Sequence, residues 1–235
     1  MDYSYAVVTG ASSGIGAEVC RLLCESGVFV YGVGRDFSKN KFSHRLFCRT
    51  ELDIGDTKAL KEFACRIKSE SKIKILVNCA GNAFFGLHES MNETKIHSMV
   101  AANIEAPMML TAFLMKDIRE QKGTIVNVSS VTAKSGRNTH GCAYGATKAA
   151  LTSFGSSLFE EVRRHGVKVC NIHPDLTDTE LYRNADFTVS GDKISCLAAE
   201  EVAAVIMQCI NSREGMVFTD ITVRPSLNVI KKKRV

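Results

Sequence analysis

Short runs of apolar residues alternate along this chain with longer segments whose apolar positions recur every three or four residues. The short runs fit buried β-strands, and the longer periodic segments fit amphipathic helices. Strands are predicted at residues 5–8, 28–33, 47–52, 73–77, 124–128, 167–172 and 216–223. Helices are predicted at about 14–27, 56–70, 93–120, 143–165 and 199–211, with an interruption near Asn103 in the third.

Strands that alternate with helices at this spacing favour a parallel sheet with helices on both faces. Right-handed crossovers make such a sheet doubly wound, and its ligands bind at the carboxyl ends of the strands. The sequence therefore predicts an α/β fold with about seven strands. No linker, internal repeat or low-complexity segment divides residues 1–235, so we expect a single domain.

The turn between the first strand and the first helix is rich in glycine and reads Thr9-Gly10-Ala11-Ser12-Ser13-Gly14-Ile15-Gly16. Glycine permits positive φ and lets backbone N–H groups come close to a ligand. The N-terminus of the following helix adds unpaired N–H donors and a partial positive charge, which suit a pyrophosphate. A glycine-rich turn without a ligand is the weaker alternative, because a strand precedes the turn and a helix follows it. We expect a dinucleotide here, contacted by Gly10, Ser12, Ser13, Gly14, Ile15 and Gly16.

Two later strand ends bear on which dinucleotide binds. Arg35 follows the second strand, at the position beside the adenosine ribose, where a cation accommodates a 2′-phosphate. A carboxylate would instead bind a free 2′-hydroxyl, but the acid Asp36 comes one residue late. This pattern favours NADP over NAD, with an ordinary surface arginine as the alternative. Asp53, next to Ile54, ends the third strand, where it either accepts from the adenine amino group or caps the turn before Asp56.

The residues that suggest chemistry are Ser129-Ser130, at the end of the fifth strand, and the pair Tyr144 and Lys148 in the next helix. A spacing of four places the phenol and the ammonium on one helix face. The pKa of a free tyrosine is about 10, and a nearby ammonium lowers it by about one to three units. Such a tyrosine can exchange a proton with an alcohol or a carbonyl, while a serine hydroxyl binds the same oxygen. A chance pair on an exposed helix is the alternative.

The composition of the chain indicates its cellular compartment and the kinds of partner that it binds. No apolar run approaches the ~20 residues that span a bilayer, and Met1–Ser4 lacks the basic and apolar regions of a signal peptide. The 9 cysteines, without C-x-x-C pairs, fit buried side chains in a reducing compartment. The net charge of +5 is mild, and the basic tail 231–235 fits a frayed, solvated end, with nucleic-acid or acidic-lipid contact as the alternative. We expect a cytoplasmic protein without a metal site, a membrane contact or a nucleic-acid partner.

Taken together, these features resemble the short-chain dehydrogenase/reductase family over essentially the whole chain. The matching motifs are Thr9-Gly10-x-x-x-Gly14-x-Gly16, Asn78-Cys79-Ala80-Gly81, Asn103, Ser129-Ser130, Tyr144-x-x-x-Lys148 and Pro174-Asp175-Leu176-Thr177-Asp178-Thr179. The resemblance implies a Rossmann-like fold and an oxidoreductase that interconverts a carbonyl and a secondary alcohol by hydride transfer. With Arg35 in place, it implies NADP as the preferred cofactor, with NAD possible.

The resemblance also implies a role for each site residue. The catalytic tetrad would be Asn103, Ser130, Tyr144 and Lys148. Tyr144 would transfer the proton and Ser130 would position the substrate oxygen. Lys148 would bond the nicotinamide ribose and lower the pKa of Tyr144, and Asn103 would hold a water that relays protons. Further cofactor contacts are implied at Asp53, Asn78, Ala80, Gly81, Pro174, Thr177 and Thr179.

Assembly is a further implication of the resemblance. Related enzymes form dimers or tetramers through two long helices, here near residues 104–121 and 143–165. The second carries more apolar bulk than one sheet-facing stripe needs, in Leu151, Phe154, Leu158 and Phe159. We therefore expect a homo-oligomer, with a tetramer favoured.

The chain departs from the family's pattern in the cofactor loops. Cys79 stands where the family often has a second asparagine, and we expect this small replacement to be tolerated. Asp175 replaces the usual glycine after Pro174, so the loop at the nicotinamide could take a different path.

A third departure concerns which residue is the catalytic serine. The segment between Ser130 and Tyr144 is one residue longer than usual, so counting back from Tyr144 selects Val131. The Ser-Ser motif instead selects Ser130. Because loops absorb insertions easily, we expect Ser130 to be the catalytic residue and the extra residue to lie within 134–142.

The substrate is less well determined. The cleft should be walled by the loop after Ser130, with Lys134, Arg137, Asn138 and His140, and by part of a substrate loop near 177–197, with Tyr182, Arg183, Phe187 and Lys193. Several cations and few large aromatics favour a small polar or anionic substrate, such as a hydroxy acid. A 3-ketoacyl thioester, a hydroxysteroid or a sugar is an alternative. So is a dinucleotide-binding sensor without catalysis, although all four tetrad residue types occur in order.

Overall fold

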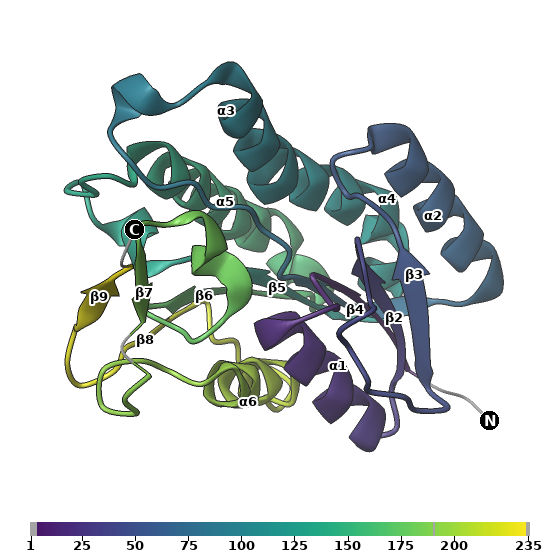
Figure 1. Cartoon of the computed structure of the whole chain (residues 1–235). Coiled ribbons are helices and arrows are strands. Elements are labelled where there is room, and N and C mark those ends of the chain that lie inside the picture. Colours follow the sequence, from purple (N-terminus) through teal and green to yellow (C-terminus); the bar gives the residue numbers. More distant parts are fainter. Residues whose placement is uncertain (1–3, 190, 234–235) are drawn as a thin grey trace.

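A sheet of 7 parallel strands, in the order β3-β2-β1-β4-β5-β6-β8, forms the centre of the molecule (Figure 1). The computed structural model describes residues 4–189 and 191–233. The strands are β1 (Tyr5–Thr9), β2 (Phe29–Gly34), β3 (Phe47–Glu51), β4 (Ile73–Asn78), β5 (Thr124–Val128), β6 (Lys168–Pro174) and β8 (Asp220–Val223). The chain starts in the middle, builds outward to β3, and then returns to build outward to β8. The strand order therefore reverses between β1 and β4, where doubly wound sheets bind ligands.

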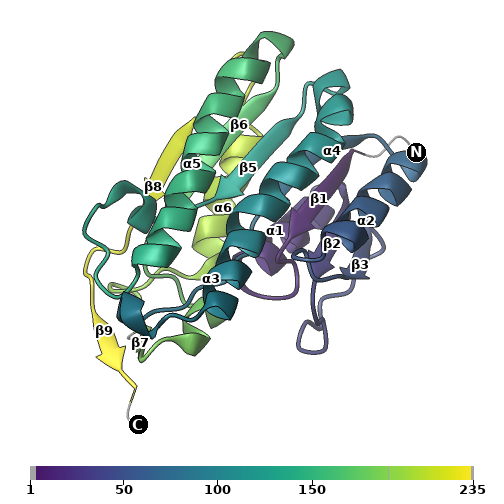
Figure 2. The ribbon, with the colours of Figure 1, turned by 90° about the horizontal axis from the view of Figure 1, so that it is seen from above.

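Helices cover both faces of the sheet (Figures 1 and 2). They are α1 (Gly14–Glu25) and α6 (Ala199–Ile210) on one face, and α2 (Thr57–Glu70), α4 (Ala106–Glu120) and α5 (Cys142–Val162) on the other. Successive strand residues point to opposite faces. Val8 and Val126 accordingly pack with α1 and α6, whereas Val7 and Ile125 pack with α2, α4 and α5. The predicted Rossmann-like fold with helices on both faces is confirmed.

The start of each helix next to the strand ends depends on its cap. Asp56 precedes α2 and accepts hydrogen bonds from the N–H groups of Lys58 and Ala59, both at 3.0 Å. Ser13 precedes α1, but its side chain makes no capping hydrogen bond. The first N–H groups of α1 are therefore left for another acceptor.

The helical segment predicted at 93–120 is interrupted where expected. α3 (Glu93–Val100) joins α4 through a wide π-helical turn, Ala101–Glu105, which contains Asn103. Contrary to the expectation from the apolar runs, the continuous stretch Glu93–Glu120 is long and apolar enough to cross a membrane. Half of its most apolar window, 50%, is buried inside the protein, as in the core helix of a globular fold.

Three asparagines lie side by side across the centre of the sheet. Asn78 on β4 pairs in register with Asn127 on β5, which pairs with Asn171 on β6. Asn78 Nδ2 donates to Asn127 Oδ1 at 2.9 Å, and Asn127 Nδ2 donates to Asn171 Oδ1 at 3.2 Å. Helix α5 crosses this row at Gly155, where a Cβ would lie 2.1 Å from Asn171 Oδ1. The Asn78 amide nitrogen is bonded within the sheet, and the cofactor contact expected at Asn78 stays a prediction.

A second, two-stranded sheet was not predicted. β7 (Phe187–Val189) pairs antiparallel with β9 (Ile230–Lys232), at the side of the molecule where the chain ends (Figure 2). Lys233 continues the contact, with its backbone N–H donating to Asp186 O at 2.8 Å. The prediction of a frayed basic tail is therefore wrong for residues 230–233, and residues 234 and 235 lie outside the described residues. The last predicted strand, at 216–223, is shorter and covers only Asp220–Val223.

Candidate active site

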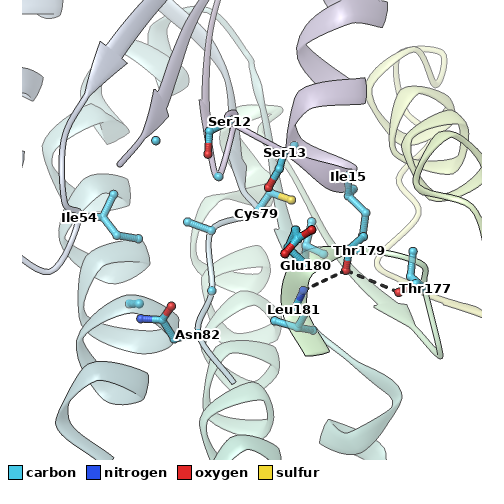
Figure 3. A pocket seen from close by; sticks show the side chains of 18 of the residues that line it. Ser12, Ser13, Ile15, Ile54, Cys79, Asn82, Thr177, Thr179, Glu180 and Leu181 are labelled. Atoms are coloured by element: carbon cyan, nitrogen blue, oxygen red, sulfur yellow. Dashed lines mark hydrogen bonds between the residues drawn. The ribbon is translucent and has the colours of Figure 1, made fainter. Parts of the chain in front are cut away.

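A cavity of about 190 Å³ runs along the carboxyl ends of the strands, across the place where the strand order reverses. Most residues predicted for the site line it, and Figure 3 shows part of this lining. They are Gly10, Ser12, Ser13, Gly14, Ile15, Gly16, Arg35, Asp53, Ile54, Ala80, Gly81, Ser130, Tyr144, Lys148, Pro174, Thr177 and Thr179. Two predicted site residues, Asn78 and Asn103, are not among the described residues that line it.

The glycine-rich turn packs tightly and points helix donors into this cavity. Gly10 has φ +72°, and a Cβ there would lie 2.9 Å from the backbone of Ala80. A Cβ at Gly16 would lie 2.3 Å from the Gly10 carbonyl oxygen, so a larger residue would push the turn open. The uncapped start of α1 supplies free N–H groups at the same point. The turn therefore fits the diphosphate of a dinucleotide, because N–H donors and the helix dipole attract anions.

The end of β2 presents a cation, and no acid, to the cavity lining among the described residues. Arg35 lines the cavity, and Asp36 does not. The Asp36 carboxylate accepts hydrogen bonds from Ser38 N at 2.7 Å and Ser38 Oγ at 3.0 Å, and these bonds lower the pKa of Asp36. A Cβ at Gly34 would lie 2.8 Å from Ser12 Cβ, which leaves little room for an acidic side chain there. Arg35, which favours NADP, therefore lies at the cavity, and Asp36, which could have favoured NAD, does not.

Asp53 and Ile54 line the cavity just after β3. Asp53 Oδ1 accepts a hydrogen bond from Gly55 N at 3.0 Å, so the carboxylate shapes the turn while it borders the cavity. The cap of α2 is Asp56 rather than Asp53. The position of Asp53 is thus compatible with an adenine contact and with a turn, but not with helix capping.

Tyr144, Ser130 and Lys148 converge on the same cavity from two elements. The Ser130 hydroxyl faces Tyr144 closely enough to lower the pKa of its phenol. Lys148 Nζ lies 5.9 Å from the centre of the Tyr144 ring and donates to Val128 O at 2.9 Å. One face of α5 supplies the tyrosine and the lysine, and the end of β5 supplies the serine. This is the arrangement that the spacing of four predicts.

Burial dominates the electrostatics of this group. Burial raises the pKa of Tyr144 well above its usual value, the nearby Tyr182 raises it further, and the Ser130 hydroxyl offsets part of the rise. Burial lowers the pKa of Lys148 to about 8, against an opposing effect of Cys79. The expected lowering of the Tyr144 pKa by Lys148 is not found in this structure, because the ammonium is itself desolvated and is bonded to the Val128 carbonyl.

The two serines at the end of β5 have different roles. Ser129 Oγ donates to Lys148 O at 3.0 Å and shares a hydrogen bond of 2.8 Å with Thr152 Oγ1, so it holds α5 against the sheet. Ser130 faces Tyr144, and the next residue, Val131, begins the short 3-10 helix η3 (Val131–Lys134). Ser130 is thus the serine that faces Tyr144, while the place of the extra residue within 134–142 stays a prediction.

Asn103 is completely buried, and its amide bonds other protein groups. Its Oδ1 accepts from Asn82 N at 2.9 Å, and its Nδ2 donates to Asn82 O and to Thr147 Oγ1, both at 2.9 Å. Asn103 therefore clamps the loop after β4 to the π-helical turn and to α5. Asn82, which it holds, lines the cavity.

The segment after β6 closes the cavity opposite the glycine-rich turn (Figure 3). Thr179 Oγ1 accepts from Leu181 N at 3.4 Å and donates to Thr177 O at 3.5 Å. A Cβ at Gly14 would lie 3.0 Å from the Thr179 methyl group, so this segment touches the glycine-rich turn. Asp175 also lines the cavity, so the loop reaches the predicted place despite this replacement.

The wall of the substrate cleft differs from the predicted one. Tyr182 and Arg183 line the cavity, but the other candidates, Lys134, Arg137, Asn138, His140, Phe187 and Lys193, do not. Lys134 instead forms an ion pair with Asp220. The expectation of several cations around the substrate is therefore wrong, because charged side chains on loops can turn to partners outside the cleft.

Aromatic side chains border Tyr144 in place of those cations. The Phe85 ring lies 5.6 Å from the Tyr144 ring and 6.0 Å from the Tyr182 ring, centre to centre. Phe187 lies 5.3 Å from Phe85, and Leu181 packs on the same cluster. Burial raises the pKa of Tyr182 to about 12, so its hydroxyl stays neutral. Of this cluster, Leu181 and Tyr182 line the cavity with Tyr144 and Arg183, whereas Phe85 and Phe187 are not among the described residues that line it.

Known proteins share this fold. A family model described as short chain dehydrogenase matches residues 4–188. The chain belongs to the short-chain dehydrogenase family. Among relatives of this short-chain dehydrogenase, an uncharacterized oxidoreductase of Staphylococcus epidermidis is 30% identical over 226 residues, which cover 94% of this chain and 96% of the relative.

Solved structures resemble this short-chain dehydrogenase over nearly its whole length. An alcohol dehydrogenase from Thermococcus sibiricus, complexed with 5-hydroxy-NADP, has a TM-score of 0.85, 19% identity, and coverage of 95% of this chain and 97% of that one. A short-chain dehydrogenase from Sphingobium yanoikuyae in complex with NADPH has a TM-score of 0.82, 25% identity, and coverage of 92% and 87%. A 4-hydroxyisoleucine dehydrogenase complexed with NADH has a TM-score of 0.82, 18% identity, and coverage of 94% and 97%.

The sequence of this short-chain dehydrogenase did not point to every lining residue. Cys79, Asn82, Glu180 and Leu181 also line the cavity. Each is adjacent to a predicted contact or within two residues of one, so the signal was their position beside the motifs. Their side chains alone suggest no chemistry.

Proposed function

We propose that this short-chain dehydrogenase is an NADP(H)-dependent oxidoreductase that interconverts a carbonyl and a secondary alcohol. One observation carries the proposal: a single cavity joins the glycine-rich turn and Arg35 to Ser130, Tyr144 and Lys148. A dinucleotide on the turn and a carbonyl beside Tyr144 would therefore share one site. The proposed partner of the enzyme is its small carbonyl or alcohol substrate. Its proposed location is the cytoplasm.

Tyr144 is the proposed general acid for reduction and the general base for oxidation. Its raised pKa keeps the hydroxyl protonated until the substrate oxygen gains charge, and the proton then passes to that oxygen. Ser130 donates a second hydrogen bond to the same oxygen. A bound nicotinamide cofactor supplies the hydride in reduction and accepts it in oxidation. Lys148, whose pKa burial lowers to about 8, lines the same cavity, and its proposed role is to bond the nicotinamide ribose.

The lining of the site favours an apolar carbonyl compound over a keto acid. Leu181 and Tyr182 line the cavity with Tyr144, Phe85 packs on the same cluster, and most of the cations expected for an anionic substrate are not among the described residues of the lining. We therefore place an aromatic or branched apolar group next to the reacting carbon. Arg183 is the cation that could bind a polar group at the far end of such a substrate.

The test is a screen of the purified protein for NADPH oxidation. The panel pairs aromatic aldehydes and ketones with keto acids of similar size, and each compound is run with NADPH and with NADH. We expect turnover with NADPH and the aromatic carbonyls. Faster turnover of the keto acids would refute the proposed substrate class, and no turnover of any carbonyl or alcohol would refute the proposed function.

A further inference from the structure

His173 is a buried residue of β6 that lies between the catalytic serine and the edge strand β8. Its side chain is 0% exposed. Nδ1 lies 3.1 Å from Ser130 O, and Nε2 lies 2.8 Å from Asp220 Oδ2. Both partners are oxygen atoms that can accept hydrogen bonds, so the ring bridges the Ser130 carbonyl on one side and the Asp220 carboxylate on the other.

Asp220 also binds the far end of the helix that Ser130 begins. Lys134, the last residue of η3, donates from Nζ to Asp220 Oδ1 and to Thr222 Oγ1, the latter at 2.9 Å. The Asp220 carboxylate on β8 thus holds the last residue of η3 through Lys134. It holds the start of η3, at Ser130, through His173. Partial burial raises the pKa of Asp220, but hydrogen bonds from Lys134 and His173 lower it more, so the net shift is downward and the group stays charged.

We propose that His173, Asp220 and Lys134 form a positioning network that fixes the Ser130 hydroxyl against Tyr144. This inference rests on the proposed function, in which Ser130 binds the substrate oxygen. The three residues are not among those that line the cavity in the described part of the chain, so they act through Ser130. A displacement of about 1 Å at a catalytic group can cost roughly a hundredfold in rate.

The backbone around Ser130 shows why its position needs this support. Ser130 Oγ accepts a hydrogen bond from Thr132 N at 3.2 Å, and Ser130 O accepts one from Ala133 N at 3.0 Å. These contacts join the serine to η3 but not to the rest of the fold. The loop that follows η3 is the one expected to carry an extra residue, and residues 135–140 are largely exposed. The bond from His173 ties the serine to β6 of the sheet, and Lys134 ties the other end of η3 to the neighbouring strand β8.

Two replacements of His173 separate positioning from packing. In His173→Asn, the amide nitrogen can take the place of Nδ1 and keep the bond to Ser130 O. In His173→Gln, the amide nitrogen can take the place of Nε2 and keep the bond to Asp220, but the bond to Ser130 is lost. Both variants lose the ring and keep a polar, uncharged side chain.

The measurements are kcat and KM for a carbonyl substrate, and the Kd for NADPH by fluorescence. We expect His173→Gln to lose about tenfold to a hundredfold in kcat, and His173→Asn to stay within about threefold of the parent. The Kd for NADPH should change less than about twofold in both, since the network does not reach Arg35 or the glycine-rich turn. Equal kcat values in the two variants would overturn the proposal.

Surface variants give a second test that does not disturb the core. Asp220→Asn and Lys134→Met should each lower kcat severalfold with NADPH binding unchanged, and Glu214→Gln, an exposed carboxylate that pairs with Lys122, is the matched control. Parent-like kcat in both network variants would overturn the proposal. A parent enzyme without any carbonyl reductase activity would instead count against the proposed function. The two failures are therefore distinguishable.

Discussion

At the scale of single residues, Lys148 illustrates how strongly burial acts on this site. Its ammonium lies inside the protein on the Val128 carbonyl, and burial lowers its pKa to about 8. Negative charge from a dinucleotide would favour the charged form of the lysine and raise this pKa again. Protonation of Lys148 and binding of the cofactor should therefore be linked.

The first prediction is that NADPH binding weakens as the pH rises through about 8. Below that value Lys148 is charged in the free enzyme and attracts the cofactor, and above it the lysine is neutral. Cofactor binding favours the charged form of Lys148. Above about pH 8, binding is therefore accompanied by the uptake of a proton, and the affinity falls as the pH rises. Calorimetry between about pH 7 and pH 9 should show that the affinity of the parent for NADPH falls as the pH rises. The affinity of Lys148→Met should depend less on pH. The same pH dependence in both proteins would contradict the linkage.

The second prediction concerns Arg35 and the choice of cofactor. Arg35 borders the cavity while Asp36 is held by Ser38, so a charge-assisted bond to a 2′-phosphate should favour NADP(H). The parent should prefer NADPH over NADH by at least about tenfold in kcat/KM, and Arg35→Ala should lose most of that preference while keeping its NADH activity. The measurement is kcat/KM with NADPH and with NADH for the parent and for Arg35→Ala. A parent that prefers NADH would show that another residue governs the site.

Local spacing allowed some site residues to be predicted and not others. Tyr144 and Lys148 were found because a separation of four residues puts both on one helix face, whatever lies around the helix. The hydrogen-bond partners of Asn78 and Asn103 could not be predicted, because the direction of a buried amide depends on partners from distant segments. Their partners here are Asn127 on β5 and Asn82 in the loop after β4. No motif on the local chain encodes those partners.

At the scale of elements, the segment around η5 (Glu180–Asn184) closes the cavity and is held from outside. Lys233 Nζ donates to Tyr182 O at 2.9 Å and to Arg183 O at 3.1 Å. The pairing of β7 with β9 fixes the same segment just beyond η5. The cavity of about 190 Å³ is smaller than the ~300 Å³ or more usual for a ligand pocket, so we expect η5 to move outward when ligands enter.

The third prediction is that the end of the chain controls the order of this segment. Removal of residues 230–235 deletes β9 and the Lys233 bonds, so η5 should become less ordered. Hydrogen exchange should quicken in residues 180–189, and the KM for the carbonyl should rise by about threefold to tenfold. Lys193→Met, which changes an exposed lysine outside the cavity, is the control. Unchanged exchange in 180–189 after truncation would show that β9 does not hold the segment.

The strands of the main sheet were predicted, but β7 and β9 were not, and the difference is physical. Strands β1, β2, β4, β5 and β6 are buried along most of their length and show as largely apolar runs. β7 and β9 each span only a few residues, and β9 includes Lys231 and Lys232, which indicate a solvated tail. Their pairing depends on a contact between segments far apart in the sequence. The interruption near Asn103, by contrast, was visible in the local pattern.

At the scale of the whole molecule, the faces of α4 and α5 remain available for assembly. Leu151 and Leu158, expected to add apolar surface to α5, are buried within the core. Phe154 and Phe159 on α5 and Phe113 on α4 are only partly buried. These aromatic side chains are the part of the predicted interface that the single chain leaves accessible.

The fourth prediction is that the protein is a homo-oligomer, with a tetramer expected. Phe154 and Phe159 should be covered by a second copy, because burying aromatic surface drives association. Light scattering at micromolar concentration should give about four times the chain mass of 25.7 kDa, and Phe159→Glu should reduce it. A parent mass near that of one chain would refute the assembly.

The turnover of the Tyr144→Phe variant is the measurement that decides whether Tyr144 is the proton donor. The substitution removes one hydroxyl from the cavity and leaves the ring among Phe85 and Leu181, so the fold and the cofactor end of the site should persist. We predict that kcat for carbonyl reduction falls by about 10²–10⁴-fold, the usual contribution of a general acid, while the Kd for NADPH changes less than about twofold. Turnover comparable to that of the parent would contradict the assignment of Tyr144 as the proton donor.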